Sequence, residues 1–251
     1  MCIFSALPVS TGKVFFVYFP MAKKIGLLVC DHVLDQYVHI NGNYPQMFRQ
    51  LLPDLELVDY FVCDGEFPED VDACDGYLAT GSKYSVYEEI DWINQLKDFV
   101  GKIDQAKQKF VGVCFGHQLL AESTGGKVEK SDKGWCVGVH SFELIQERQW
   151  MKEKANPLNI LMMCQDQVIQ LPPDTEVLAT GPTVEYSIIQ KGEHMLGIQG
   201  HPEFSKAYDR KLMEDRVERM GAETVRIGLE SLEKDPHRAL FSRWITDFLL
   251  R

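Results

Sequence analysis

The chain has 251 residues, of which 45% are hydrophobic and 25% are charged, and its formal net charge is −11. This composition is ordinary for a globular protein with a buried core, and the negative charge argues against nucleic acid and anionic membranes as partners. The seven cysteines are irregularly spaced and include no C-x-x-C pair, so they fit neither a disulfide framework nor a zinc site. We therefore expect a reducing, cytoplasmic compartment and neither a metal nor a cofactor.

Residues 1–20 do not continue the pattern of the rest of the chain. They contain no basic segment followed by a cleavage site, and the apolar run at 14–19 is too short to span a bilayer. Met21 then precedes an ordinary entry into a first strand. We predict that residues 1–20 are an extension outside the fold and that residues 21–251 form one domain. A genuine extra edge segment is the alternative.

Strands and helices alternate along the first half of the chain. Short apolar runs predict buried strands, and longer stretches with apolar residues at helical spacing predict helices. The predicted strands cover 25–30, 55–62, 76–79 and 110–113, and the predicted helices cover 44–52, 90–108 and 118–122. This alternation is typical of an α/β fold with a doubly wound, mostly parallel sheet and flanking helices.

The second half of the chain has a different pattern. Shorter strands separated by turns predict a short antiparallel addition to the sheet, and two charged amphipathic segments predict closing helices. The predicted strands are 137–144, 160–163, 176–179, 184–189 and 195–198, and the helices are 205–220 and 236–250.

Gly112, Cys114 and Gly116 have the spacing of a nucleophile elbow in which cysteine replaces serine. Such a strand-to-helix turn leaves no room for side chains two positions either side of the nucleophile. The following helix N-terminus favours the thiolate of Cys114. The plain alternative is a buried cysteine at the end of a strand beside ordinary loop glycines.

A second stretch supports the interpretation of Cys114 as a nucleophile. The apolar residues 195–198 lead into His201, and Glu203 follows two positions later. A cysteine nucleophile needs a base, and that base needs an orienting group. Both segments are expected at the carboxyl ends of strands, where open α/β sheets bind ligands.

Three segments together resemble the signatures of class I (triad-type) glutamine amidotransferases: Gly112 to Gln118, Thr80 to Ser82, and Gly200 to Glu203. The resemblance runs from about Lys24 to the C-terminus and is closest to stand-alone GMP-synthase-like amidotransferases and γ-glutamyl peptidases. It implies a flavodoxin-like class I glutamine amidotransferase fold. The implied substrate is glutamine or a γ-glutamyl small molecule, whose γ-amide would be cleaved through a γ-glutamyl thioester.

The resemblance also assigns roles to individual residues. Cys114 would be the nucleophile, His201 the base and Glu203 the orienting acid. The backbone N–H groups of Gly81 and Phe115 would form the oxyanion hole. The remaining substrate contacts would come from the Gln118 side chain and from the main chain of Trp135, Cys136 and Val137. His117, next to the elbow, is at the wrong offset for a base and is interpreted as structural.

One position departs from the resemblance, and several functions stay open. Cys164 stands where similar sequences usually have His, which puts the role of that His in doubt without removing a member of the triad. The activity could be that of a glutaminase-type hydrolase, a γ-glutamyl peptidase, or an ammonia-donating subunit that acts only with a separate synthetase chain. A non-enzymatic binding protein is a further class, which the intact Cys114, His201 and Glu203 argue against.

Overall fold

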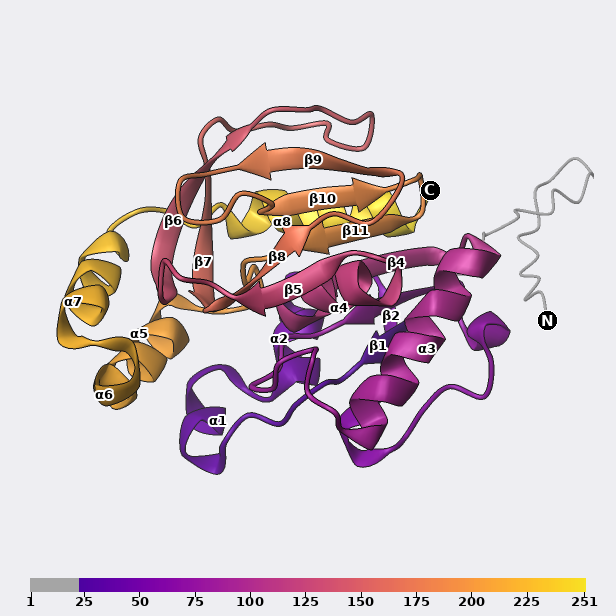
Figure 1. Ribbon diagram of the computed structural model, residues 1–251, viewed down its shortest axis with the longest axis horizontal. Helices are drawn as coiled ribbons and strands as arrows, with labels where there is room; N and C mark the ends of the chain where they lie inside the picture. Colours follow the sequence, from indigo (N-terminus) through magenta and orange to yellow (C-terminus); the bar gives the residue numbers. More distant parts are fainter. Residues whose placement is uncertain (1–22) are drawn as a thin grey trace, which may run out of the picture.

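A nine-stranded sheet with the order β2-β1-β3-β4-β11-β10-β9-β6-β7 organises the molecule (Figure 1). The computed structural model describes residues 23–251, so the extension predicted for residues 1–20 lies outside the described residues. The first five strands in this order pair in parallel. They are β2 (Glu56–Tyr60), β1 (Lys24–Leu28), β3 (Gly76–Ala79), β4 (Lys109–Val113) and β11 (Met195–Ile198).

The antiparallel addition continues the same sheet beyond β11. Its strands are β10 (Ile188–Lys191), β9 (Thr175–Thr180), β6 (Cys136–Leu144) and β7 (Leu158–Cys164). A separate two-stranded ribbon is formed by β5 (Lys127–Lys130) and β8 (Asp166–Gln170).

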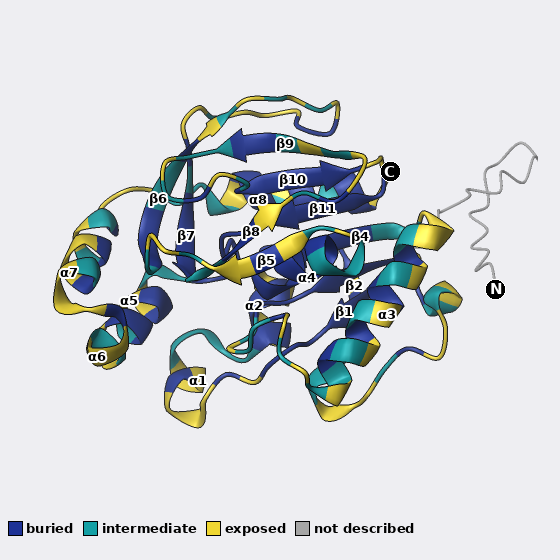
Figure 2. Ribbon diagram, in the orientation of Figure 1, coloured by how far each residue is buried: buried dark blue, intermediate teal, exposed yellow. Residues whose placement is uncertain are grey.

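Helices cover both faces of the parallel strands because successive strand residues point to opposite sides. Phe110 packs in one core with α3 (Asp91–Ala106) and α4 (Phe115–Ser123). Val111 packs in a second core with α2 (Tyr44–Leu51) and α8 (Arg238–Leu249). In Figure 2 the strands β1, β3, β4 and β11 between these two layers are almost entirely buried. The predicted doubly wound, mostly parallel fold is thereby confirmed.

The remaining helices lie near the end of the sheet that carries β6 and β7, and beside the loops that follow β1 and β2. They are α1 (Asp35–Asn41), α5 (Lys206–Asp215), α6 (Val217–Met220) and α7 (Ala222–Ser231), with short 3₁₀ turns η1 (Val62–Asp64) and η2 (Val71–Ala73). Among residues 23–251, no helix is long and apolar enough to cross a membrane.

Several predicted boundaries were wrong. The strand expected at 184–189 is β10, which begins only at Ile188, because Gly181 donates a backbone hydrogen bond to Val184 and closes a turn there. The helix expected at 205–220 is interrupted at Arg216, whose backbone leaves the helical region (φ −121°, ψ 21°). The elements α1, β5 and β8 were not predicted, since each is short and largely polar, and α7, which follows Gly221, was not predicted either.

Candidate active site

Cys114 occupies the sharp turn between β4 and α4. Its backbone has φ 52° and ψ −101°, a strained conformation for a residue that carries a Cβ atom. The two flanking glycines are required by close packing. A Cβ on Gly112 would approach the carbonyl oxygen of Gly116 to 2.1 Å, and a Cβ on Gly116 would approach the Ala79 carbonyl oxygen to 2.5 Å. The turn therefore has the elbow geometry that the spacing predicts.

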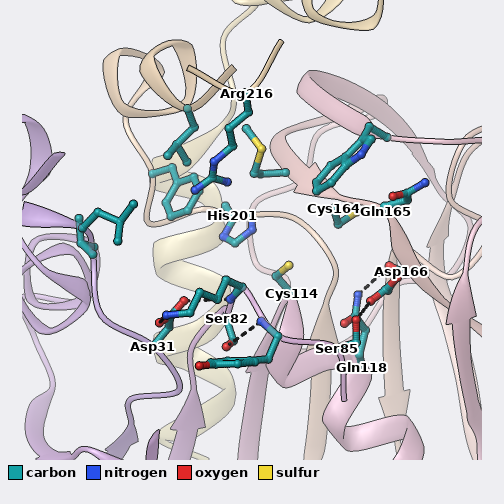
Figure 3. Close-up of a pocket in the computed structure, with 18 of the residues that line it drawn as sticks. Asp31, Ser82, Ser85, Cys114, Gln118, Cys164, Gln165, Asp166, His201 and Arg216 are labelled. Carbon is teal, nitrogen blue, oxygen red and sulfur yellow. Dashed lines mark hydrogen bonds and ion pairs between the residues drawn. The ribbon is translucent and has the colours of Figure 1, made fainter. Parts of the chain in front are cut away.

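His201 reaches Cys114 because their strands are neighbours. β11 pairs in parallel with β4, and the Cys114 N–H donates to the Ile198 carbonyl at 2.9 Å. After β11 the chain is held by a bond from the His201 N–H to the Leu161 carbonyl at 2.7 Å. Figure 3 shows the Cys114 sulfur pointing into the pocket, with the His201 ring beside it.

Glu203 holds the imidazole of His201 from the other side. Its Oε1 lies 2.8 Å from Nδ1 of His201, which leaves Nε2 for the sulfur of Cys114. Both side chains are shielded from solvent, with the carboxyl of Glu203 fully buried. The arrangement has the order nucleophile, base and orienting carboxylate.

The charge state of His201 follows from these two neighbours. Burial by itself lowers the pKa of the imidazole, but Cys114 and Glu203 together outweigh it and raise the pKa of His201 well above its ordinary value. The imidazolium form is therefore favoured at neutral pH. Such a group stabilises an adjacent thiolate and can donate a proton to a leaving nitrogen.

Two backbone segments flank the sulfur where an oxyanion would develop. Phe115 is the first residue of α4, so its N–H has no acceptor within the helix. A Cβ on Gly81 would lie 2.8 Å from Cε1 of His201 and 3.7 Å from Cβ of Cys114. Only glycine allows the main chain to approach the Cys114–His201 pair so closely.

Gln118 belongs to a buried hydrogen-bond chain that ends on the nucleophile. Its Nε2 donates to the Asp166 carbonyl at 2.7 Å and lies 3.2 Å from Oε1 of Gln199. Nε2 of Gln199 in turn points at the Cys114 sulfur, 3.7 Å away. The sequence did not single out Gln199, although it lies two residues before His201, in the stretch that contains the predicted base.

The pocket above Cys114 has a volume of about 220 Å³. Trp135 is part of its wall, whereas the buried residues Cys136 and Val137 lie behind this wall in β6 and do not line the pocket. Charged side chains of both signs line it. The basic ones are Lys83, Lys130, Arg216 and Arg219, and the acidic ones are Asp31 and Asp166.

The acidic residues of the pocket are held in fixed positions. The nearly buried Asp31 accepts from the Lys83 ammonium at 2.8 Å and from the Lys83 N–H at 2.9 Å. Asp166 accepts hydrogen bonds from the hydroxyl groups of Ser85 and Tyr87, which link β8 to the loop after β3. Neither acid was predicted as a site residue, because their partners are distant in sequence.

Two further titratable groups are fully buried near the site. His117 packs under β11, and burial, partly offset by the Gly197 backbone, lowers its pKa to about 4, so it stays neutral. Asp209 on α5 has no exposed surface, and burial raises its pKa to about 7 against the opposing influence of His201. The His117 ring lies against Gly197 of β11, where a Cβ would come within 2.6 Å of its Nδ1.

Within residues 23–251, one group of side chains lies close enough together to bind a metal ion: His32, Cys63 and Asp64. Their potential ligand atoms lie within 4.8 Å of one another, and Nε2 of His32 is already hydrogen-bonded to Asp64 at 2.8 Å. Both of these side chains are about half exposed. The group is well suited to a surface ion pair and offers only three ligands.

Comparison with known proteins identifies the family. The family described as glutamine amidotransferase class-I matches residues 32–220, a stretch that includes the elbow and the His201 turn. The chain belongs to the class I glutamine amidotransferase family. As a member of it, the protein is an enzyme, and the resemblance seen in its motifs is confirmed.

Relatives of this amidotransferase include γ-glutamyl peptidases and a GMP synthase. Over 224 residues it is 34% identical to gamma-glutamyl peptidase 4 of Arabidopsis thaliana, covering 84% of this chain and 88% of the relative. Over 162 residues it is 28% identical to the glutamine-hydrolyzing GMP synthase of Phocaeicola vulgatus, covering 64% of this chain but only 30% of that protein.

Solved structures of other proteins have a fold similar to that of this amidotransferase. A glutamine amidotransferase from Thermotoga maritima superposes with a TM-score of 0.72 at 18% identity, covering 92% of this chain and 99% of the other. One from Methylobacillus flagellatus superposes with a TM-score of 0.65 at 16% identity, covering 90% and 94%.

Proposed function

We propose that the protein hydrolyses the γ-amide of glutamine or of a γ-glutamyl compound, with Cys114 as nucleophile. The observation that carries this proposal is the contact series from the Cys114 sulfur through His201 to the buried carboxylate of Glu203. The family supports the same class of reaction.

In the proposed mechanism the Cys114 thiolate attacks the γ-carbonyl carbon. The negative charge on the carbonyl oxygen would be stabilised by the N–H groups of Phe115 and Gly81, whose main chains lie next to Cys114. The His201 imidazolium donates its Nε2 proton to the leaving nitrogen, and a γ-glutamyl thioester remains on Cys114. Water, deprotonated by His201, then attacks the thioester and releases glutamate.

The hydrogen-bond chain through Gln118 supports the position of the nucleophile in this mechanism. Gln199 donates toward the Cys114 sulfur, while Gln118 connects Gln199 to the main chain at Asp166. Gln118 thus lies between the nucleophile and the wall that would contact the amino-acid end of the substrate. Trp135 on the same pocket would close over that end.

A γ-glutamyl peptide is favoured over free glutamine by the charge of the pocket. Beyond Cys114, the basic side chains of Lys130, Arg216 and Arg219 line the cavity. Ammonia, the leaving group of glutamine, needs no cation, whereas an amino acid or peptide leaving group carries a carboxylate that Arg binds well. The name of the Arabidopsis relatives agrees with this preference.

Glutamate release by the purified protein tests the proposal. Glutamine and a series of γ-glutamyl dipeptides are compared, with Cys114→Ala as the inactive control. We expect kcat/KM at least about tenfold higher for the dipeptides, which is a difference of about 1.4 kcal/mol in transition-state binding. Activity only after addition of a synthetase chain would instead support an ammonia-donating subunit, and equal activity of Cys114→Ala would refute the nucleophile.

A further inference from the structure

Cys136 and Cys164 face each other across two antiparallel strands at the wall of the pocket. They form the first cross-strand pair of β6 and β7, with Cys136 directly opposite Cys164. Opposite residues of an antiparallel pair project to the same side of the sheet, with Cα atoms about 4.5 or 5.5 Å apart. A disulfide requires a Cα separation of about 4.4–6.8 Å, so the register places both cysteines within bonding range.

The two sulfur atoms also interact as free thiols. A hydrogen bond from Cys164, helped by His140, overcomes burial and lowers the pKa of Cys136 to about 5, while the same contact and burial raise the pKa of Cys164. Within the pair, Cys136 is therefore the more acidic thiol and Cys164 the less acidic one. A thiolate beside a thiol is the arrangement that forms disulfides most readily.

Access to the pair comes from the substrate pocket. Cys164 lines the pocket, and only 5% of its surface is exposed, while Cys136 lies behind it with 2% exposed. Figure 3 shows Cys164 on the wall that faces Cys114 and His201. A small oxidant can reach this wall, whereas a folded protein such as a thiol oxidoreductase cannot.

We propose that Cys136 and Cys164 form a reversible disulfide with hydrogen peroxide as the oxidant, and that this bridge lowers the activity of the Cys114 site. The existence of the bridge is independent of the proposed function, whereas its effect on activity rests on it. The position at which similar sequences usually have His thereby gains a chemical role in this chain.

Hydrogen peroxide is the only oxidant that formation of the disulfide requires. Cys164, the member of the pair that lines the pocket, loses its thiol proton and attacks one peroxide oxygen; the O–O bond breaks, and a sulfenic acid and water form. The sulfur of the second cysteine then attacks the sulfenic sulfur, the S–O bond breaks, and the oxygen leaves as water. In total, two thiols and one hydrogen peroxide yield one disulfide and two water molecules. A dithiol reductant reverses the bridge.

The bridge would act on the site through the residues next to the cysteines. Bond formation draws the two sulfurs to about 2.05 Å. Cys136 follows Trp135, and Cys164 ends the strand that leads to Asp166, so a change in the geometry of the cysteine pair is passed to both of these residues on the pocket wall. The Asp166 carbonyl is the acceptor for Gln118, which connects to Gln199 and the nucleophile. Closing the bridge therefore disturbs the support of Cys114.

Peptide mapping of the full-length protein tests the bridge. Wild type, Cys114→Ala and Cys63→Ser proteins are treated with hydrogen peroxide, the remaining thiols are alkylated, and the proteins are digested without reductant. We expect a peptide pair joined through Cys136 and Cys164 in all three proteins, which disappears after dithiothreitol. Two alkylated cysteines at these positions, or a bridge from Cys164 to Cys114, would overturn the proposal.

Activity is then measured at a peroxide dose at which mapping shows Cys114 still to be a thiol. We expect kcat/KM of wild type and Cys63→Ser to fall about tenfold and to recover with dithiothreitol. The ratio of treated to untreated activity should stay near one for Cys136→Ala, each protein being compared with its own reduced form. A complete bridge without loss of activity would refute the regulatory effect. A reduced protein inactive on every γ-glutamyl substrate would refute the proposed function and leave the bridge standing.

Discussion

The imidazole of His201 lies flat against the ring of Phe204, with the ring centroids 4.0 Å apart and the planes inclined by 9°. Phe204 is itself fixed by an edge-on contact with Tyr208 on α5, at 4.7 Å. The imidazole is thus restrained by a carboxylate at its edge and by an aromatic ring on its face. The sequence contains Phe204 one residue after Glu203, but the stacking depends on the turn that brings its ring back over His201.

We predict that Phe204→Leu lowers kcat about tenfold and changes KM little, because the imidazole loses the surface that fixes its orientation. Glutamate release measured under saturating substrate checks this. Phe248→Leu is the matched control, since Phe248 is an equally buried aromatic residue on α8 that packs beside Lys109, at the opposite end of β4 from Cys114. It should lower stability without lowering kcat. An equal loss of kcat in both variants would contradict the stacking role.

The orienting carboxylate should matter less than the nucleophile or the base. We predict that Glu203→Gln lowers kcat about 10²-fold, whereas Cys114→Ala and His201→Ala abolish activity. Because Glu203 contributes to the raised pKa of His201, the inflection that His201 gives to the kcat/KM profile should lie at lower pH in the Glu203→Gln variant than in wild type. A variant with wild-type activity and an unchanged profile would show that Glu203 takes no part.

Cys114 should be the first cysteine to react with a glutamine-like electrophile. It alone among the cysteines of residues 23–251 combines a place on the pocket floor with a helix N-terminus and the imidazolium of His201. Mass spectrometry after brief labelling locates the modified residue. His201→Ala should slow the labelling of Cys114 by more than about tenfold. Faster labelling of the half-exposed Cys63 would contradict the assignment.

His117 should make the fold sensitive to acid. Its pKa is lowered from 6.5 to about 4 by burial, so the unfolded chain binds the proton more tightly than the folded protein. The associated stability is present above pH 6.5 and is lost as the pH falls toward 4, by up to about 3 kcal/mol. Urea unfolding of wild type and His117→Asn at several pH values measures this. The difference between the two curves should shrink by that amount toward pH 4.

Asp209 should have the opposite effect on the pH dependence of stability. Burial raises its pKa from 3.8 to about 7, so the folded protein binds this proton more tightly than the unfolded chain. Its contribution to stability is therefore present below pH 3.8 and is lost as the pH rises through 7. Relative to wild type, Asp209→Asn should gain up to about 4 kcal/mol of unfolding free energy between pH 4 and pH 8. A difference that does not vary with pH would show that Asp209 titrates normally.

The parts of the fold that were predictable from the sequence are those with strong apolar patterns. The strands at 76–79 and 195–198 have the predicted bounds, because both are short apolar runs buried on two faces. The ribbon of β5 and β8 was missed, since its stability comes from pairing between segments about 40 residues apart rather than from local pattern. Helix α7 was missed because it follows Gly221, which bends the chain with φ 89°.

Some residues of the candidate site were likewise predictable from the sequence, and others were not. Cys114, His201 and Glu203 lie in short motifs whose spacing alone indicates their chemistry. Gln199, Phe204 and Asp209 were not singled out by these motifs, and each matters through one contact that only the folded chain creates. The same is true of the Cys136–Cys164 pair, which is 28 residues apart in sequence and adjacent only through strand register.

The pairing of β4 with β11 places the nucleophile and the base at the ends of two hydrogen-bonded strands in the centre of the sheet. Cys114 directly follows β4, and His201 lies three residues after the end of β11, so opening of the central ladder would separate them. Enzyme activity should therefore fall in parallel with the fraction of folded protein. During slow heating, loss of glutamate release and loss of the circular-dichroism signal of the sheet should occur at the same temperature, which would make a simple enzyme assay a measure of the folded fraction.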